Sequence, residues 1–306
     1  MADHNPARVI LWSTPRSVST AFLKCITFVD RSIAWHEPFI FANRCAPDGT
    51  IRAIIEKTRR DEPSTELPLI AEYQTLKHKH FPSALCSSSD NIYEASNHSF
   101  SWIKQQLEAP QPGKDLIFVK DMVQGIDGHY YGIPDGFRHT FLMRHPLKVF
   151  DSFKRMYLRA GKQNELTQLP EMIIPSGKFF KELYDLLMYV KLHHDPEPVV
   201  IDADDLLEDP EGILSAYCTS TGISYSQNLL QWPAGTDEVL NRWIIQKEVL
   251  CVPRLLEVFR KCFDSTCFGP PMPLPDRNEL PEDVLQLADS CMPYYEKLYE
   301  QRLRAK

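Results

Sequence analysis

The stretch VILWSTPRSVSTAFLKCI, residues 9–26, reads as a buried strand, a polar turn and a helix. Its first four residues are apolar and rich in β-forming types, as in a central parallel strand. From Ser17 onward, apolar residues recur at helical spacing. Backbone N–H groups of such a turn and of the helix that follows point at one spot, and the helix dipole favours an anion there. The stretch therefore predicts an anion-binding loop over residues 13–20.

The side chains of this loop leave two interpretations open. Arg16 offers a planar guanidinium, and hydroxyl groups surround it in the sequence, those of Ser13, Thr14, Ser17, Ser19 and Thr20. The alternative is an ordinary helix N-terminus with Ser17 as its cap. The loop is not a Walker A motif, because G-x-x-x-x-G-K-[ST] and its lysine are absent. ATP or GTP hydrolysis needs that motif and Mg²⁺, whereas the less charged sulfuryl group needs only a few donors and one or two cations.

Composition limits the partners of the chain. It has 306 residues, of which 43% are hydrophobic, enough for one large core. A formal net charge of -7 argues against a general nucleic-acid or membrane-surface binder, so an anion must be held by a few placed cations. The 8 cysteines include no C-x-x-C pair, which indicates reduced thiols and no zinc site. No window approaches the ~18 apolar residues of a membrane span, and we expect a cytoplasmic protein.

Apolar runs typical of strands alternate with amphipathic segments along the chain. Strands are expected at residues 9–12, at 33–39, around 117, just before Pro146 and around 199. Helices are expected at residues 17–28, 91–108, 147–158, 178–193, 206–221 and 283–304. The alternation predicts one α/β domain over residues 1–306, with a central parallel sheet and helices on both faces. Polar insertions near 46–90 and 160–178 are expected to be binding loops, and a proline-rich extension starts at 269.

A second motif lies in FLMRHPLKVFDSFKRM, where a strand ends at Arg144 and Pro146 takes a first helical position. Ser152 follows eight residues after the arginine, in the second turn of that helix. A strand-end arginine and a helix hydroxyl can together bind a phosphate monoester, and such a charge-assisted contact is worth ~1.5–3 kcal/mol. The alternative is a surface arginine paired with Asp151 or Asp135.

Together the two motifs resemble those of the sulfotransferase superfamily that uses 3′-phosphoadenosine 5′-phosphosulfate (PAPS). TPRSVST is similar to the family's 5′-phosphosulfate loop, and RHPLKVFDS to its 3′-phosphate motif. WHEPF, FVKD and STCF resemble a less-studied branch of sulfotransferase-like P-loop proteins, and DADDLLEDPEGILSAYCTSTGI resembles the family's acidic-leucine turn. The resemblance spans roughly residues 9–268. It implies a P-loop-type three-layer sandwich that moves a sulfuryl group from PAPS to a hydroxyl or amine of an acceptor.

By position, the resemblance assigns roles at both ends of the cofactor. The residues that would hold the 5′-phosphosulfate are Arg16, Ser17, Val18, Ser19 and Thr20. Arg144 and Ser152 would hold the 3′-phosphate, which distinguishes PAPS from ATP.

The chain departs from the commonest family pattern in three places. Arg16 stands where the cytosolic small-molecule enzymes usually carry lysine. Lys120 is followed by Asp121 and Met122, so the histidine of the K-x-H motif is missing. No R-K-G triplet near the C-terminus supplies the second side of the 3′-phosphate. The candidate substitutes are Arg254, Arg260, Lys261 and Ser265.

A base must accept the proton that the acceptor O–H or N–H loses as sulfur is attacked. Glu37 lies near the end of the second predicted strand, and ligands of parallel sheets bind at that edge. Heparan-type sulfotransferases resemble this arrangement, with a lysine on the next strand; Lys120 would then stabilise the sulfuryl group or orient Glu37. Arg16 completes the predicted catalytic set. His36 is the competing base, and a buried Glu37–arginine pair is the structural alternative.

Three functions fit these features: a sulfotransferase acting on a small molecule, a nucleotide or sugar kinase with a degenerate loop, and a non-catalytic nucleotide-binding protein. The paired motifs favour the first. VVIDADD reads better as a strand before a helix capped by Asp204 or Asp205 than as a Walker B strand. The sequence names no acceptor, and leaves a monomer and a homo-oligomer equally open.

Overall fold

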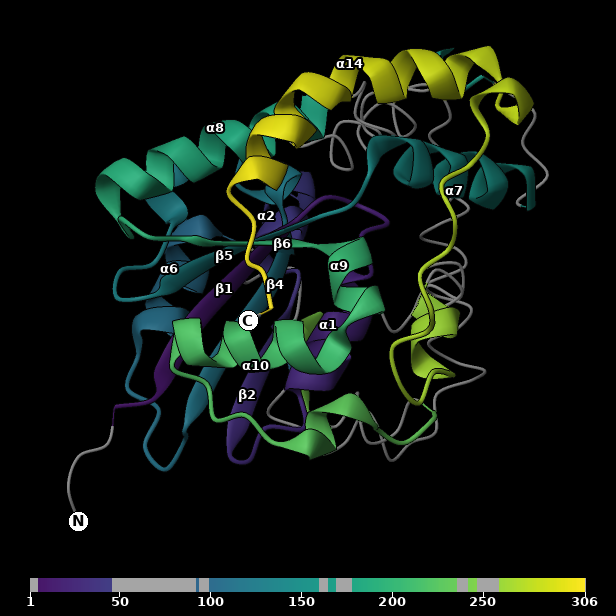
Figure 1. Cartoon of the computed structure of the whole chain (residues 1–306). Helices are drawn as coiled ribbons and strands as arrows, with labels where there is room; N and C mark the ends of the chain where they lie inside the picture. Colours follow the sequence, from purple (N-terminus) through teal and green to yellow (C-terminus); the bar gives the residue numbers. More distant parts are fainter. Residues whose placement is uncertain are drawn as a thin grey trace, which may run out of the picture.

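Seven parallel strands form the sheet of the computed structural model, which describes residues 5–45, 92–93, 99–159, 165–168, 178–235, 242–246 and 259–305. They are β1 (Ala7–Ser13), β2 (Ser32–His36), β3 (Ile92–Tyr93), β4 (Leu116–Met122), β5 (Arg138–Met143), β6 (Val199–Asp202) and β7 (Trp243–Gln246). Their order is β3-β7-β2-β4-β1-β5-β6, and every pairing is parallel. The predicted α/β class with a central parallel sheet is confirmed (Figure 1).

Helices connect the strands and cover the sheet. They are α1 (Ser19–Ile26), α2 (Pro38–Cys45), α6 (Phe100–Glu108), α7 (Pro146–Arg159), α8 (Lys178–His193), α9 (Ala203–Glu208), α10 (Pro210–Thr221) and α14 (Glu282–Glu300). Short 3₁₀ turns lie at Val123–Gly125, Tyr130–Gly132, Leu166–Gln168, Gln227–Leu230 and Arg277–Glu279. None of these described helices combines the length and apolar character that crossing a membrane requires.

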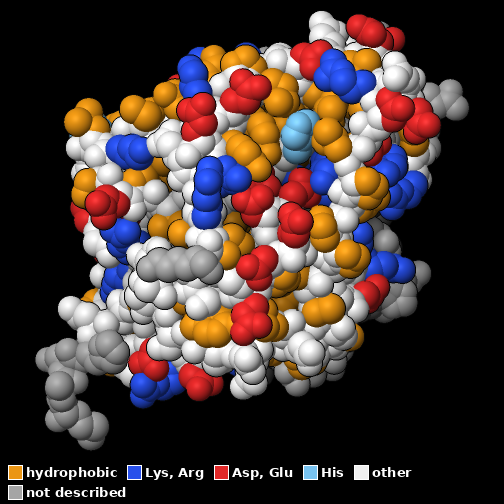
Figure 2. All heavy atoms as spheres, viewed as in Figure 1, with side chains coloured by type: hydrophobic (Ala, Val, Ile, Leu, Met, Phe, Trp, Pro, Cys, Tyr) orange, Lys and Arg blue, Asp and Glu red, His pale blue; other side chains and the backbone are white. Residues whose placement is uncertain are grey.

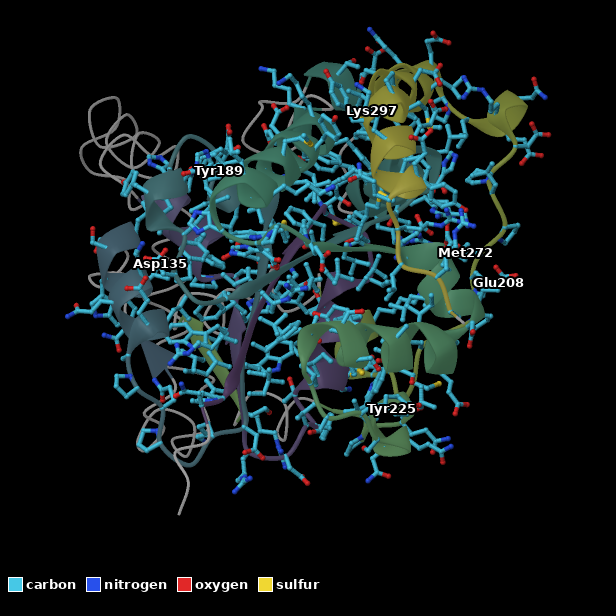
Figure 3. The ribbon with its side chains drawn as sticks, turned by 60° about the vertical axis from the view of Figure 1, so that its left-hand side comes forward. Asp135, Tyr189, Glu208, Tyr225, Met272 and Lys297 are labelled. Carbon is cyan, nitrogen blue, oxygen red and sulfur yellow. The ribbon has the colours of Figure 1, made fainter. Side chains whose placement is uncertain are left out.

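Side chains of β1 enter two apolar layers, because successive residues of a strand point to opposite faces. Ile10 and Trp12 pack with α7, α8 and α14, whereas Val9 and Leu11 pack with α1 and α10. Figure 1 shows these two groups of helices on opposite sides of the sheet. In Figure 3, Tyr189 of α8 and Lys297 of α14 lie on one side, and Tyr225, which follows α10, lies on the other. The predicted three-layer arrangement, with helices on both faces, is therefore confirmed.

Several element boundaries differ from the sequence prediction. The segment expected to be helical over 91–108 contains β3, and its helix starts only at Phe100, where the Ser99 hydroxyl accepts a bond from the Trp102 amide at 3.1 Å. The expected strand 33–39 stops at His36, because Glu37 adopts a left-handed conformation with φ 52°. Pro38 then occupies the first position of α2 rather than a strand end.

The expected helix over 206–221 is two helices, and its expected cap is wrong. Asp209 accepts a bond from the Gly212 amide at 2.9 Å and starts α10. The cap of α9 is Asp202, whose carboxylate accepts bonds from the amides of Asp204 and Asp205 at 2.8 and 3.2 Å. Asp204 and Asp205 therefore contribute capped backbone amides, and their side-chain carboxylates remain available for other partners.

Near its end the chain returns to the edge of the sheet. The helix expected to reach residue 304 ends at Glu300, and the Leu303 amide then donates to the Val200 carbonyl of β6 at 2.7 Å. The proline-rich extension from 269 runs without regular structure until the 3₁₀ turn at Arg277–Glu279. The predicted insertions near 46–90 and 160–178 lie almost wholly outside the described residues.

Candidate functional site

The loop between β1 and α1 has an unusual backbone. Arg16 and Val18 both take left-handed conformations, with φ 62° and 58°. Such a conformation costs about 1–3 kcal/mol outside glycine, most of all in a β-branched residue, and persists only where the surroundings impose it. Strain of this kind concentrates at functional sites.

The hydroxyl groups of the loop are only partly free for a ligand. Ser13 donates to the Asp121 carbonyl at 2.9 Å and Ser17 donates to the Thr14 carbonyl at 2.6 Å. The expected Ser17 cap is therefore wrong: the N-cap of α1 is Val18, which offers no side-chain acceptor. The Thr14 hydroxyl is buried without a hydrogen-bond partner among the described residues. The N-terminal amides of α1 and this hydroxyl can thus receive an anion.

The two sequence motifs meet at the carboxyl edge of neighbouring strands. Because β1 pairs directly with β5, the loop that follows Ser13 lies beside the segment that follows Met143. The Arg16 Nε donates to the Ser152 hydroxyl at 3.1 Å, and the Arg144 Nη1 lies 3.5 Å from the Arg16 carbonyl. The first loop and both residues of the second motif therefore form one cluster.

Positive charge is concentrated around Arg16. Burial lowers the pKa of this guanidinium, and the nearby cations Arg144, Arg159 and Arg155 lower the pKa further. Ser152, Arg155 and Arg159 are spaced i, i+3 and i+7 along α7, so they share a face of the helix. Sequence reasoning missed Arg155 and Arg159, although this spacing was visible. These three arginines therefore repel the Arg16 guanidinium, and a bound anion would relieve that repulsion.

Acidic groups offset only part of this charge. Asp204 lies 3.6 Å from the Arg144 Nε and 2.9 Å from the Lys148 Nζ. The first of these contacts is too long for a hydrogen bond, and the Arg144 Nε has no hydrogen-bond partner in the described part of the chain. Figure 2 shows acidic side chains gathered over α9, the helix that carries Asp204. The expected alternatives for Arg144 were wrong, since Asp151 pairs with Arg155 and Asp135 with Lys104.

Glu37 and Lys120 form a buried ion pair along the same edge of the sheet. Lys120 lies on β4, which pairs directly with β1, and Glu37 follows β2, the next strand beyond β4. The Lys120 ammonium donates to the Glu37 Oε1, and the Glu37 amide donates to the Lys120 carbonyl at 2.7 Å. Both residues are almost inaccessible, at 3% and 0% exposure. Lys120 is thus a partner of the Glu37 carboxylate.

His36 lies in the apolar layer beside α1, with its Nε2 3.9 Å from the Glu37 Oε1. Its ring stacks on Trp243 at 5.0 Å between centroids and meets Phe259 edge-on at 5.0 Å. Burial lowers the pKa of His36 to about 4, against the raising effect of Glu37. The His36 ring therefore lies among aromatic side chains, whereas the Glu37 carboxylate is held by Lys120.

The candidates for the second side of the 3′-phosphate all come from the late segment 254–265. Arg254 lies outside the described residues, while Arg260 and Lys261 are exposed. Ser265 is engaged elsewhere, since its hydroxyl donates to the Cys262 carbonyl at 2.6 Å and accepts from Trp232 Nε1 at 3.2 Å.

A lysine that sequence reasoning missed holds this late segment. Lys24 of α1 is fully buried, and its ammonium donates to the carbonyls of Cys262, Phe263 and Ser265 at 3.2, 2.8 and 2.9 Å. Its position in a predicted helix was visible in the sequence, but its partners are backbone atoms of a distant segment. The segment around residue 263 is thereby held against α1, the helix that follows the anion-binding loop.

Comparisons with known proteins find similarity over part of the chain. Residues 185–302 match the family model of the sulfotransferase domain. The matched region begins after both anion-binding motifs, so it does not bear on their individual residues. Across the described residues, no group of three or more histidine, cysteine or acidic side chains is arranged to hold a metal ion.

Similar proteins include two from Arabidopsis thaliana. Branched-chain-amino-acid aminotransferase-like protein 2 is 26% identical over 52% of this chain and 23% of its own length. Protein 1 of the same name is 28% identical over 32% of this chain and 15% of its own length. The matched parts are thus less than a quarter of these relatives.

Two solved structures align with most of this chain. The sulfotransferase domain from the curacin biosynthetic pathway covers 95% of the chain and 99% of its own, at 16% identity and a TM-score of 0.44. The sulfotransferase domain from the Synechococcus PCC 7002 olefin synthase covers 95% and 96%, at 17% identity and the same TM-score.

Proposed function

We propose that the chain is a PAPS-dependent sulfotransferase that transfers the sulfuryl group to a hydroxyl or amine of a small-molecule acceptor. The observation that carries this proposal is the direct contact of the two motifs, Arg16 with Ser152 and Arg144 with the Arg16 backbone. A nucleotide with anions at both its 5′ and 3′ positions suits two anion-binding turns that lie side by side.

The residues present suit such a ligand. The Thr14 hydroxyl and the Arg144 Nε are donors without hydrogen-bond partners within the described residues. The free N-terminal amides of α1 add further donors. Ser17, Ser19 and Thr20 lie in the same turn, and their roles follow from the family motif rather than from a contact. The loop residues and the amides of α1 would hold the 5′-phosphosulfate. Arg144 and Ser152 would hold the 3′-phosphate.

Glu37 supplies the base in this proposal. Its carboxylate takes the proton from the acceptor O–H or N–H, while the acceptor atom forms a bond to sulfur. The bond between sulfur and the 5′-phosphate oxygen breaks, and adenosine 3′,5′-bisphosphate leaves. Arg16 and the amides of α1 stabilise the charge that grows on the departing phosphate. Lys120 holds Glu37 in place by donating a hydrogen bond to its carboxylate.

The activity test uses radiolabelled PAPS and a panel of small hydroxyl and amine acceptors. We expect label to pass to at least one acceptor, and adenosine 3′,5′-bisphosphate to raise the melting temperature. A ligand at one hundred times its dissociation constant adds about 2.7 kcal/mol to the free energy of unfolding. Radiolabelled ATP with Mg²⁺ is the matched control for a kinase. Transfer from ATP, or binding of the bisphosphate without any transfer from PAPS, would contradict the proposal.

A further inference from the structure

Asp121 directly follows Lys120 and is fully buried at the end of β4. Its carboxylate accepts hydrogen bonds from the amides of Phe39 and Ile40 at 2.5 and 3.1 Å, and from its neighbour Met122 at 2.7 Å. The first two amides belong to the first turn of α2, which otherwise lacks acceptors for them. Asp121 therefore holds the start of the helix that follows Glu37.

The backbone of Asp121 is hydrogen-bonded to the start of the anion-binding loop. The Asp121 carbonyl accepts the hydroxyl of Ser13 at 2.9 Å, and Ser13 is the last residue of β1. The two strands pair in parallel, with Trp12 opposite Asp121. One residue thus contacts both the strand that leads into the anion-binding loop and the helix that directly follows the proposed base.

Glu37 needs support of this kind. Its φ of 52° is a strained conformation for a residue with a side chain. Its own amide is held by the Lys120 carbonyl, and the two amides that follow Pro38 are held by Asp121. The strained residue is therefore fixed from both sides by consecutive residues of β4, Lys120 and Asp121.

We propose that Asp121 is a positioning residue, which sets the Glu37 carboxylate relative to the anion-binding loop without touching substrate. This inference rests on the proposed function. An alternative is that Asp121 is only a cap of α2, in which case its loss would lower stability without a separate effect on turnover.

The surroundings of Asp121 support a close coupling to Glu37. Burial raises the pKa of Asp121 to about 8, with Glu37 adding to the rise and the Phe39 amide, the Met122 amide and Lys120 opposing it. The charged groups that face Asp121 are therefore the two members of the buried ion pair. A substitution of Asp121 will therefore alter the electrostatic surroundings of Glu37 and Lys120.

The test compares Asp121→Asn with Asp209→Asn. Both substitutions replace a carboxylate that accepts helix N-terminal amides with an amide of the same shape, and Asp209 serves only α10. Loss of either cap should lower the melting temperature of the chain. We expect kcat of Asp121→Asn to fall about 10- to 100-fold, because small misplacements of a reacting group have effects of this size. The acceptor KM and the affinity for adenosine 3′,5′-bisphosphate should stay within about threefold, and Asp209→Asn should keep wild-type kcat.

Two further measurements keep the inference falsifiable. Ser13→Ala removes only the link between the Asp121 backbone and the loop, and should lower kcat by a smaller factor. A crystal structure of Asp121→Asn should show Glu37 displaced from Lys120. An undisplaced Glu37 overturns the positioning role whether or not the wild type is active, and so does a kcat within twofold of wild type. An inactive wild type overturns the proposed function instead, and the crystal structure then decides the positioning role alone.

Discussion

Turnover should fall about 10²–10⁴-fold when Glu37 is replaced by glutamine, because this factor is typical of the loss of a general base. Affinity for adenosine 3′,5′-bisphosphate should not change, since Glu37 lies two strands from the anion-binding loop. Initial rates of radiolabelled sulfate transfer measure the first effect, and calorimetric titration measures the second.

The buried ion pair makes a stability control necessary. Glu37→Gln leaves the Lys120 ammonium buried and unpaired, and breaking a buried pair costs about 3–5 kcal/mol. The double variant Glu37→Gln/Lys120→Met removes both charges, so it should fold better than the single variant and still lack turnover. His36→Phe keeps an aromatic ring against Trp243 and should retain activity. If Glu37→Gln were active and His36→Phe inactive, the base would be His36.

Affinity for adenosine 3′,5′-bisphosphate should fall about 10- to 150-fold in Arg144→Ala, the factor that corresponds to a charge-assisted contact of ~1.5–3 kcal/mol. Affinity for 5′-AMP, which lacks the 3′-phosphate, should change by less than about threefold. Titration calorimetry with both ligands measures the difference. An equal loss for the two ligands would place Arg144 at the 5′ end or in a purely structural role.

Asp204→Asn is the matched control for this variant. It removes the carboxylate beside Arg144 and Lys148 but keeps both cations. Because the carboxylate competes with a phosphate for these cations, bisphosphate affinity should be equal to or higher than that of the wild type. A loss as large as that of Arg144→Ala would mean that Asp204 is needed to hold the arginine in position.

Much of the fold followed from hydrophobic pattern. The continuous apolar run 9–12 marked the central strand of a parallel sheet, and the predicted helix over 178–193 is α8 as the structure has it. The strands β3 and β7 were missed because each is too short to show a period of its own. The break at Glu37 was missed for another reason: only a backbone held by neighbouring strands keeps a glutamate left-handed, and no local pattern reports this.

The candidate site was predicted in part. Arg16, Arg144 and Ser152 carried a recognisable spacing, and the structure brings them together. Asp121 and Lys24 act on backbone amides and carbonyls of distant segments, so the sequence shows neither partner. The same holds for Ser13 and Ser17, whose hydroxyls were expected to face an anion but bond to carbonyls instead.

The central claim is that the turns after β1 and β5 together hold the two phosphates of one adenosine nucleotide. The most direct test is calorimetric titration of the wild type with adenosine 3′,5′-bisphosphate, 5′-AMP and ADP in the presence of EDTA. The account predicts that the bisphosphate binds at least about 10-fold more tightly than 5′-AMP or ADP, the least gain expected from one charge-assisted phosphate contact. Equal affinities for the three nucleotides, or binding of ADP alone once Mg²⁺ is restored, would contradict it.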